Sequence, residues 1–506
     1  MKKRNLQRIF AAFMATAMVV GGTACSKEEK KPDTTPTPTQ DAGTTTTTPE
    51  PTKDEGGSGS TETTPEPTQE VTTPEPTQVV EDDKWADVDL GGMEIIVRDW
   101  WSPEDPGEPK NDYEEAQRNY QQEMMEKYHF KIRSLAISDW GSAPQDFVDY
   151  VTNKGDENNY VFVLRNDPAI VSAMANGLMY DLSTLDCLDF TEEKFAANRT
   201  HEMYSYGSSI YCCFAGPSEP RDGLFFNPDL LKAAGIEPNS IYDMQANGTW
   251  TWEAFEDMLS KVQRDTDGDG VDDVFGLCCN NGVCVTTAVI SNGGEYVGKK
   301  DGKFTYRLED PETTEALQWI TDIFTKYNNH DPEGAEWNYY MSDFRDGHTA
   351  FMMDQEYQVG ANGVFWGDNA PNFTPGFVMF PKGPKASTYI NLWDNNPHAI
   401  PACYDADRAW KIAFAWNLYT NPVPDYEDYN GYVVTAQNSI VDERAQDETI
   451  PMMSEPEHGT VTYHAIIPDM QAGPEFIWSI GPNADVAAAQ EAIRDTWKAY
   501  IDAANK

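Results

Sequence analysis

The sequence is poor in positive charge. Its 506 residues include 37 lysines and arginines against 84 aspartates and glutamates, which gives a formal net charge of −47 at pH 7. Binding to nucleic acid needs lysines and arginines that neutralise phosphates, so this balance excludes nucleic acid as a partner. The excess of carboxylates instead favours solubility and repulsion of other anions.

Long hydrophobic runs and short catalytic motifs are also lacking. No apolar run after the first residues reaches the length of about 20 that a membrane helix needs. The sequence has no Gly-x-Ser-x-Gly, no His-Glu-x-x-His and no phosphate-binding loop. We therefore expect a protein that is not an enzyme. The many carboxylates leave a glycoside-acting enzyme as the alternative, because such enzymes need only two placed carboxyl groups.

The cysteines form no recognisable metal or disulfide pattern. None of the cysteine spacings suits zinc, and no histidine clusters with them. Apart from Cys25 there are seven, an odd number that cannot all pair within one chain. We expect free buried thiols that pack as small hydrophobes, with a Cys279–Cys284 disulfide as the alternative.

The N-terminus carries an export signal. A positive start at 2–8 precedes the apolar run Ile9–Val20 and four small residues, the pattern of a signal peptide over 1–24. Cys25 follows directly, and the arrangement resembles a bacterial lipobox, although Gly22 stands where that pattern has leucine. The resemblance implies acylation (palmitate) of Cys25 and anchoring to the outer face of the cell membrane. Plain secretion, with Cys25 an ordinary thiol, is the alternative.

Residues 25–84 almost lack aliphatic side chains. Thr, Pro, Glu, Gly and Ser dominate, and Thr-Thr-Pro-Glu-Pro-Thr recurs at Thr47, Thr63 and Thr72. Such a segment cannot bury enough apolar surface to offset its ordering entropy. We predict a disordered linker that its prolines extend at about 3.1 Å per residue.

Residues 85–506 are rich in aromatics and long enough for two domains. Strands are predicted at 92–98, 129–135 and 160–164, with helices at 113–128 and 147–152 between them. This alternation predicts a parallel sheet covered by helices. Hydrophobic periodicity and capping residues predict further helices at 230–234, 252–262, 311–327, 405–420 and 485–504.

An aspartate-rich loop has the spacing of a calcium site. Carboxylates stand at positions one, three, five and nine, with a backbone carbonyl at position seven: Asp265, Asp267, Asp269, Asp273 and Val271. Gly270 at position six supplies the turn, whereas Gly276 stands where an EF-hand has its bidentate glutamate. We expect Ca²⁺ to brace this loop without touching the substrate. The alternative is a turn in which Asp265 only accepts backbone hydrogen bonds.

Four segments resemble a known family. Leu224–Pro238 and Thr249–Phe255 are similar to the central signature of bacterial extracellular solute-binding proteins of family 1. Gly177–Leu182 and Phe344–Met352 are similar to further segments of that family. The segments run in family order over most of residues 90–420.

The resemblance implies an α/β fold of the type II periplasmic-binding-protein kind, with two lobes, a hinge and a ligand cleft. The implied first lobe is 85–207 plus 350–397, and the second is 208–349 plus 398–506. The implied function is that of a monomer that captures a sugar or oligosaccharide outside the cytoplasm and delivers it to an ABC import permease. A sensor that presents its ligand to a membrane receptor is the alternative.

Candidate ligand contacts follow from sheet geometry, because ligands of open α/β sheets bind beyond the carboxyl ends of strands. Aromatics recur there beside carboxylates and amides, a combination that suits sugars. The candidates that follow predicted strands are Asp99, Trp100, Trp101, Trp140, Asn166 and Asp167. The candidates after the Phe344 segment and in the rest of the implied first lobe are Asp354, Glu356, Trp366, Trp393, Asp394 and Asn395, and Asn281 follows the aspartate-rich loop. Glu219 and Arg221 are added because they lie where the chain is expected to cross between lobes.

Overall fold

The computed structural model describes residues 84–328, 332, 334–359, 363, 365 and 367–506. The predicted signal peptide, Cys25, Trp366 and all of the predicted linker except Lys84 lie outside these residues. Asp82–Lys506 form one compact unit. None of the helices in its described part is both long enough and apolar enough to cross a bilayer.

The first lobe is built on a four-stranded sheet in the order β13-β3-β1-β2. Strands β1, β2 and β3 are parallel, and the short β13 is antiparallel to β3. The three strands predicted from the sequence and their parallel arrangement are therefore confirmed. The bounds are Met93–Asp99 (β1), Phe130–Ala136 (β2), Asn159–Val163 (β3), His398–Ala399 (β13), Asp112–Lys127 (α1), Ala143–Thr152 (α2), Pro168–Ala175 (α3) and Ala406–Tyr419 (α12).

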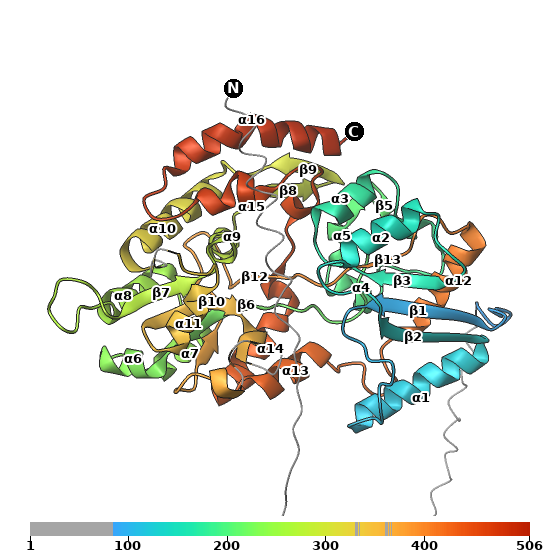
Figure 1. Cartoon of the computed structure of the whole chain (residues 1–506), viewed down its shortest axis with the longest axis horizontal. Coiled ribbons are helices and arrows are strands. Elements are labelled where there is room, and N and C mark those ends of the chain that lie inside the picture. The colour runs from blue at the N-terminus through green and yellow to red at the C-terminus, as the bar shows by residue number, and fades with distance from the viewer. Residues whose placement is uncertain (1–83, 329–331, 333, 360–362, 364, 366) are drawn as a thin grey trace, which may run out of the picture. The chain divides into compact units, whose positions relative to one another are not determined.

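The second lobe has its own mixed sheet, in the order β11-β6-β10-β7. Strand β10 is antiparallel to β6 and parallel to β7. Figure 1 shows this sheet beside that of the first lobe, each with its own covering helices. The bounds are Asp222–Phe226 (β6), Phe275–Cys279 (β7), Thr349–Gln355 (β10), Gly376–Val378 (β11), Pro228–Ala233 (α6), Asn239–Ala246 (α7), Trp252–Val262 (α8), Asn281–Ser291 (α9), Pro311–Tyr327 (α10) and Tyr339–Arg345 (α11).

Six short strands and six further α-helices, among them the long C-terminal α16, complete the described part of the unit. The strands are Ser205–Tyr206 (β4), Ser209–Ile210 (β5), Val297–Lys300 (β8), Lys303–Tyr306 (β9), Asn391–Leu392 (β12) and Gly459–Thr460 (β14). The helices are Glu193–Ala196 (α4), Thr200–Met203 (α5), Gly431–Ser439 (α13), Ile450–Ser454 (α14), Ala472–Glu475 (α15) and Val486–Ala504 (α16).

Local sequence explains where the helices begin. The Asn227 side chain accepts hydrogen bonds from the backbone N–H groups of Asp229 and Leu230, and Pro228 fills the first helical position of α6. Thr251 caps α8 and Asp405 caps α12 in the same way. Side-chain acceptors of this kind satisfy the N–H groups that a helix leaves unpaired at its start, so the predicted helices form where their caps stand.

The division of the chain between the lobes differs from the prediction. Residues 350–397 were expected to resume the first lobe, but β10 and β11 lie in the second sheet. Residues from 398 onward were expected in the second lobe, but β13 pairs with β3 and α12 packs in the first-lobe core. The physical reason is that β10 is buried along almost its whole length. Such a strand fits the middle of either sheet, so its sequence does not reveal its partners.

The chain crosses between the sheets three times in consequence, through 213–221, 391–397 and 420–430. The first two crossings run side by side: Cys213 and His398 exchange backbone hydrogen bonds, and Pro220 bridges Trp393. The ring of Trp393 packs so closely on Gly459 that a Cβ atom there would lie 1.8 Å from it. This tight contact fixes the second crossing against β14.

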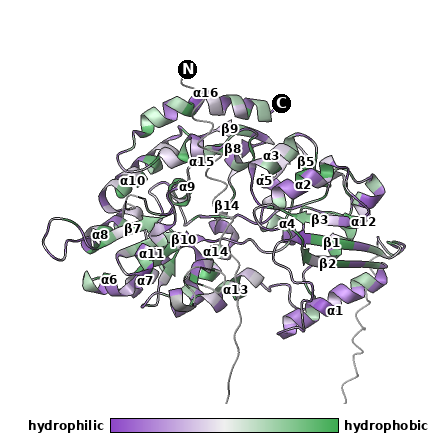
Figure 2. Cartoon of the chain, viewed as in Figure 1, coloured by the Kyte–Doolittle hydropathy of each residue, from purple (hydrophilic) through white to green (hydrophobic). Residues whose placement is uncertain are grey.

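The core is dense and apolar, whereas the outer helices carry the charge. Figure 2 shows α1 as largely hydrophilic, and no residue of α1 is fully buried. Trp250, Trp252, Trp416 and Trp497 are buried in this core. No disulfide joins any two of the seven described cysteines, and all except the half-buried Cys403 are buried. The predicted burial of these cysteines thus holds for six of the seven, and Cys279 and Cys284 are not joined.

Candidate functional site

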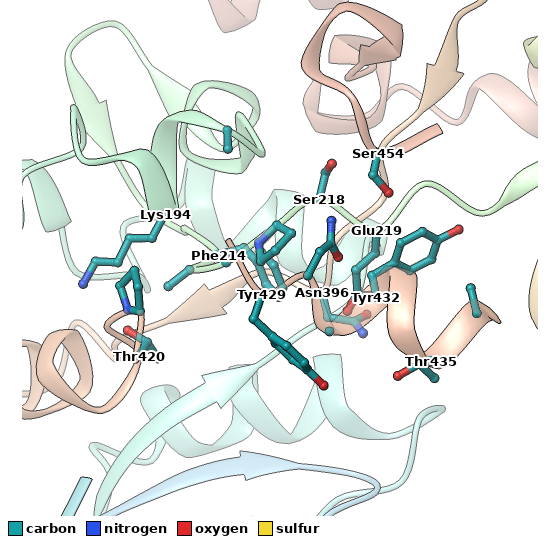
Figure 3. Close-up of a pocket in the computed structure, with 18 of the residues that line it drawn as sticks. Lys194, Phe214, Ser218, Glu219, Asn396, Thr420, Tyr429, Tyr432, Thr435 and Ser454 are labelled. Atoms are coloured by element: carbon teal, nitrogen blue, oxygen red, sulfur yellow. The ribbon is translucent and has the colours of Figure 1, made fainter. Parts of the chain in front are cut away.

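A cavity of about 1840 Å³ lies between the two sheets, lined by both lobes and by all three crossings. Its volume exceeds the roughly 300–1,000 Å³ of a typical small-molecule site. In Figure 3, Ser218, Glu219 and Asn396 of the crossings lie between Lys194 on one side and Tyr432 and Thr435 on the other. The cavity therefore has two opposed walls and a floor made by the crossing segments.

The first-lobe wall is aromatic. Trp100 and Trp101 follow β1 directly and pack edge to face, with ring centroids 5.0 Å apart. Trp101 is 56% exposed and Trp140 is 60% exposed. The Arg165 guanidinium lies 4.3 Å from the centre of the Trp140 ring. Large rings left this exposed at the ends of strands are available to the flat face of a ligand.

Two predicted contacts support this wall from behind and do not line the cavity. Asp99 is buried, and its carboxylate accepts hydrogen bonds from the backbone N–H groups of Trp101 and Ser102. Asp167 caps α3 and forms an ion pair with Arg165 at 2.8 Å. Asp99 and Asp167 therefore hold the loops that present the tryptophan rings. Asn166, which lies between Arg165 and Asp167 in the sequence, does line the cavity.

The floor gathers carboxylates around one arginine. The Arg221 guanidinium lies 2.7 Å from a carboxylate oxygen of Glu219 and 3.5 Å from one of Glu356. Arg221 precedes β6 and Glu356 follows β10, and the pairing of these strands brings the two residues together. Asp394 also lines the cavity, with its side chain open to it and no hydrogen-bond partner among the described residues.

The crowding of the floor changes its acid–base chemistry. Burial raises the pKa of Glu356 to about 8 against the opposing attraction of Arg221. Burial, with repulsion from Asp394, raises the pKa of the neighbouring Asp222 to about 7. Asp394 is accessible from the cavity but surrounded by protein on its other sides, and this partial desolvation raises its pKa too. In all three groups burial penalises the charged form of the carboxyl more than the nearby Arg221 favours it.

Side chains of the second crossing point alternately toward the cavity and away from it. Asp394 and Asn396 line the cavity, whereas Trp393 and Asn395 point the other way and are buried. The Asn395 side chain accepts a hydrogen bond from the Glu219 N–H and donates one to the Thr200 hydroxyl. Successive side chains of an extended segment point to opposite faces, so Asp394 and Asn396 face the cavity, whereas Trp393 and Asn395 hold the crossings together.

Two further candidates lie elsewhere in the second lobe. Asp354 is buried and accepts hydrogen bonds from the Tyr340 hydroxyl and the Gln358 amide. Asn281 is exposed at the start of α9. Neither lines the cavity. Of the predicted contacts, the structure brings together at the cavity Trp100, Trp101, Trp140, Asn166, Glu219, Arg221, Glu356 and Asp394.

The third crossing supplies cavity residues that were not predicted from the sequence. It contributes tyrosines and acidic side chains, and the Tyr429 ring stacks on Tyr113 of α1 with centroids 3.5 Å apart. The segment follows a helix rather than a strand, so a search for ligand contacts beyond the carboxyl ends of strands does not find it. Its alternation of tyrosine with aspartate, glutamate and asparagine was the available signal. The added residues include Tyr426, Glu427, Asp428, Tyr429, Asn430 and Tyr432.

The predicted calcium loop is distant in sequence from all of these residues. Asp265, Asp267 and Asp269 each offer a carboxylate oxygen within 4.8 Å of the others. Gly270 has the positive φ of +92° that the turn requires. The Asp265 carboxylate also accepts hydrogen bonds from the Gly268 and Gly270 N–H groups, which lower its pKa.

The fourth predicted carboxylate is placed differently. Asp273 is not part of the group of three, and its carboxylate accepts hydrogen bonds from the Thr266 N–H and hydroxyl groups. Three of the four predicted carboxylates therefore converge. Val271, predicted to contribute its backbone carbonyl, has an exposed side chain.

Residues 216–414 match the family of bacterial extracellular solute-binding proteins. The predicted resemblance to this family is confirmed. The match begins at the first crossing and ends within α12, so it spans the whole second sheet and two of the three crossings. The family consists of binding proteins rather than enzymes, and its description places them outside the cytoplasm.

Solved structures share the two-lobed fold at low sequence identity. The cyclic α-maltosyl-1,6-maltose binding protein of Arthrobacter globiformis aligns with a TM-score of 0.53 at 14% identity, covering 82% of this chain and 98% of its own. UgpB of Mycobacterium tuberculosis in complex with glycerophosphocholine aligns with a TM-score of 0.51 at 15% identity, covering 81% and 98%. A cyclo/maltodextrin-binding protein complexed with maltotetraose aligns with a TM-score of 0.50 at 13% identity, covering 82% and 95%.

Proposed function

We propose that this protein captures a sugar or oligosaccharide in the cavity between its lobes and delivers it to an ABC import permease. The observation that carries the proposal is the pairing of exposed tryptophan rings on one wall with carboxylate, amide and guanidinium groups on the floor. Ring faces pack against the apolar C–H surface of a sugar, and the polar groups bond its hydroxyls. Closure of the lobes about the crossings hides the ligand and creates the surface that a permease recognises.

A glycan panel tests the binding step. We expect at least one oligosaccharide to raise the melting temperature of the purified protein in proportion to the logarithm of its concentration, because a ligand that binds only the folded state stabilises it. The Trp101→Ala/Trp140→Ala variant should lose this shift. A shift produced by peptides or polyamines but by no saccharide would defeat the carbohydrate assignment.

Delivery is tested in the producing cell. Deleting the gene should abolish uptake of the labelled sugar that the panel identifies, and restoring the gene should restore uptake. Unchanged uptake together with loss of a transcriptional response to the same sugar would instead favour the alternative role, in which the protein presents its ligand to a membrane receptor.

We further propose that a lipid on Cys25 holds the protein at the outer face of the cell membrane. The support is the sequence: a positive start, an apolar run and small residues directly before the cysteine. A fatty-acid probe should label the wild type and not the Cys25→Ser variant. Equal labelling of the two would exclude the anchor.

Calcium in the loop that joins α8 to β7 is proposed on the carboxylates of Asp265, Asp267 and Asp269. Their oxygens, within 4.8 Å of one another, are the hard ligands that Ca²⁺ prefers. Calcium should raise the melting temperature of the EDTA-treated protein, and Asp267→Asn should abolish the increase. An unchanged melting temperature with no bound calcium by elemental analysis would identify the loop as a simple turn.

A further inference from the structure

The cavity is lined by more acidic than basic side chains. Among the described residues that line the cavity, six are acidic and three are basic. The acidic residues are Glu193, Glu219, Glu356, Asp394, Glu427 and Asp428. The basic residues are Arg165, Lys194 and Arg221.

Two of the three cations are already engaged outside the floor. Arg165 pairs with Asp167, a residue behind the cavity wall, and stacks on Trp140. Lys194 is buried, donates to the Asn417 carbonyl oxygen at 2.9 Å and lies 3.4 Å from the Glu192 carboxylate. The floor is therefore left with Arg221 as its only cation among these lining residues.

Arg221 does not satisfy the carboxylates around it. It contacts Glu219 and Glu356, but one carboxylate oxygen of Glu356 is buried without a hydrogen-bond partner. Glu356 is 3% exposed and lines the cavity. Asp394 faces the cavity with no partner among the described residues. Carboxylates whose oxygens lack hydrogen-bond donors attract a cation and repel an anion.

The aromatic groups beside the floor suit a cation as well. The Tyr357 ring lies 5.8 Å from the Arg221 guanidinium, and the hydroxyl of Tyr432 is buried without a partner. Ring faces attract ammonium groups through their quadrupole, most strongly where water is excluded. A ligand with phosphate, sulfate or uronic acid groups would instead meet the carboxylates directly.

We propose that the saccharide bound in this cavity carries a free amine, and that its ammonium group sits on the floor between Glu219, Glu356 and Asp394. This inference rests on the proposed function, since it specifies the class of sugar that the same cavity takes. The ammonium donates up to three hydrogen bonds, which matches the carboxylate oxygens that lack donors. The tryptophan wall then receives the sugar ring that bears the amine.

Three oligomers with one backbone test the proposal. They are the β-1,4-linked tetramers of glucosamine, N-acetylglucosamine and glucose, which differ only at carbon 2. Isothermal titration calorimetry should give the glucosamine tetramer an affinity at least about tenfold above the other two, the gain expected from charge-assisted hydrogen bonds. The advantage should shrink as salt concentration rises, because salt screens the attraction.

A charge-neutralising variant assigns the preference to the floor. Asp394→Asn should reduce the glucosamine advantage several-fold and weaken binding of the glucose tetramer much less, because the amide can still bond a hydroxyl. Asp394 is open to the cavity and has no partner to lose, so the substitution should not unfold the protein. Asp502→Asn makes the same change of charge on an exposed residue of α16, and it should leave all three affinities as they are.

The outcomes separate this inference from the proposed function. Equal or tighter binding of the acetylated or neutral tetramer would overturn the amine proposal and leave carbohydrate capture standing. Binding of spermidine with no saccharide bound at all would overturn both. Tighter binding of the glucosamine tetramer that persists fully in Asp394→Asn would overturn the assignment to the floor.

Discussion

The aromatic wall and the acidic floor of the cavity differ in how they are built. The wall consists of Trp100, Trp101 and Trp140, each in a loop of the first lobe, near the carboxyl end of a parallel strand. The floor consists of residues on segments that leave one sheet for the other. The wall belongs to one lobe, whereas the floor is shared by both lobes. We infer that the wall supplies affinity and the floor selects charge.

The largest expected effect comes from removing the wall. Trp101→Ala/Trp140→Ala should weaken saccharide binding about 100-fold, in line with the cost of truncating central tryptophans at an interface. The loss should be equal for charged and neutral sugars if the wall acts only through apolar contact. The measurement is calorimetric titration with the matched tetramers.

The melting temperature of the ligand-free double variant should stay that of the wild type, because both rings are exposed. Trp337→Ala is the matched control, since Trp337 is 71% exposed and does not line the cavity. A drop in ligand-free stability, or a loss confined to one kind of sugar, would contradict the division between wall and floor.

A smaller effect, on the free energy of unfolding, is expected from removing the cation of the floor. Arg221→Met leaves Glu219 and Glu356 without their cation and should cost about 2 kcal/mol of unfolding free energy. This lies below the 3–5 kcal/mol for a fully buried pair, because 29% of the Arg221 side chain is exposed. The loss should be greater at about pH 8 than at about pH 5, where Glu356 holds its proton and needs no cation.

Thermal unfolding at the two pH values measures this difference. Arg345→Met is the control, because Arg345 pairs with the neighbouring exposed Asp346, and surface pairs contribute little. An equal loss at both pH values would show that Arg221 acts through packing rather than through charge.

The smallest expected effect is a change of pH dependence. Glu356 binds its proton more strongly in the folded state, with a pKa of about 8, than in the unfolded state, where the ordinary value is 4.5. Its contribution to stability is therefore fully present below about pH 4.5 and is lost as the pH rises through about 8. The groups that face it are Arg221, Glu219, Asp222 and Tyr432.

Glu356→Gln removes this titration. The melting temperature of the variant should fall less between about pH 5 and pH 8 than that of the wild type, by about 2 °C if the difference is near 1 kcal/mol. Asp502→Asn is again the control for the change of net charge. A steeper fall in Glu356→Gln would mean that the ionised side chain stabilises the floor.

The wall could be predicted from the sequence more completely than the floor. The strands of the first lobe alternate with helices, so their parallel order and the residues after them could be derived from periodicity. Trp100, Trp101, Trp140 and Asn166 were located in this way. Strand β10 could not be assigned to its sheet, because its buried residues suit a central strand of either lobe and its partners are set by tertiary pairing.

The floor was predicted less completely for a related reason. The run 393–396 was recognised as functional, but which of its side chains face the cavity depends on the register of the crossing against 213–221. Pairing of Pro220 with Trp393 sets that register and turns Asp394 inward to the cavity and Asn395 away from it. Tyr429 and Tyr432 were missed because they follow a helix, and only the folded chain brings their segment to the cavity.

The buried thiols give this protein a practical property. Burial raises the pKa of Cys187 to about 12 and also raises that of Cys212, Cys213 and Cys403, so these sulfurs hold almost no reactive thiolate at neutral pH. In the Cys25→Ser background, a cysteine placed at the exposed Thr435 beside the cavity would be the main site open to alkylation. A fluorophore attached there would report a closure of the lobes directly. The labelled protein could then serve as an optical sensor of its own ligand without added reagents.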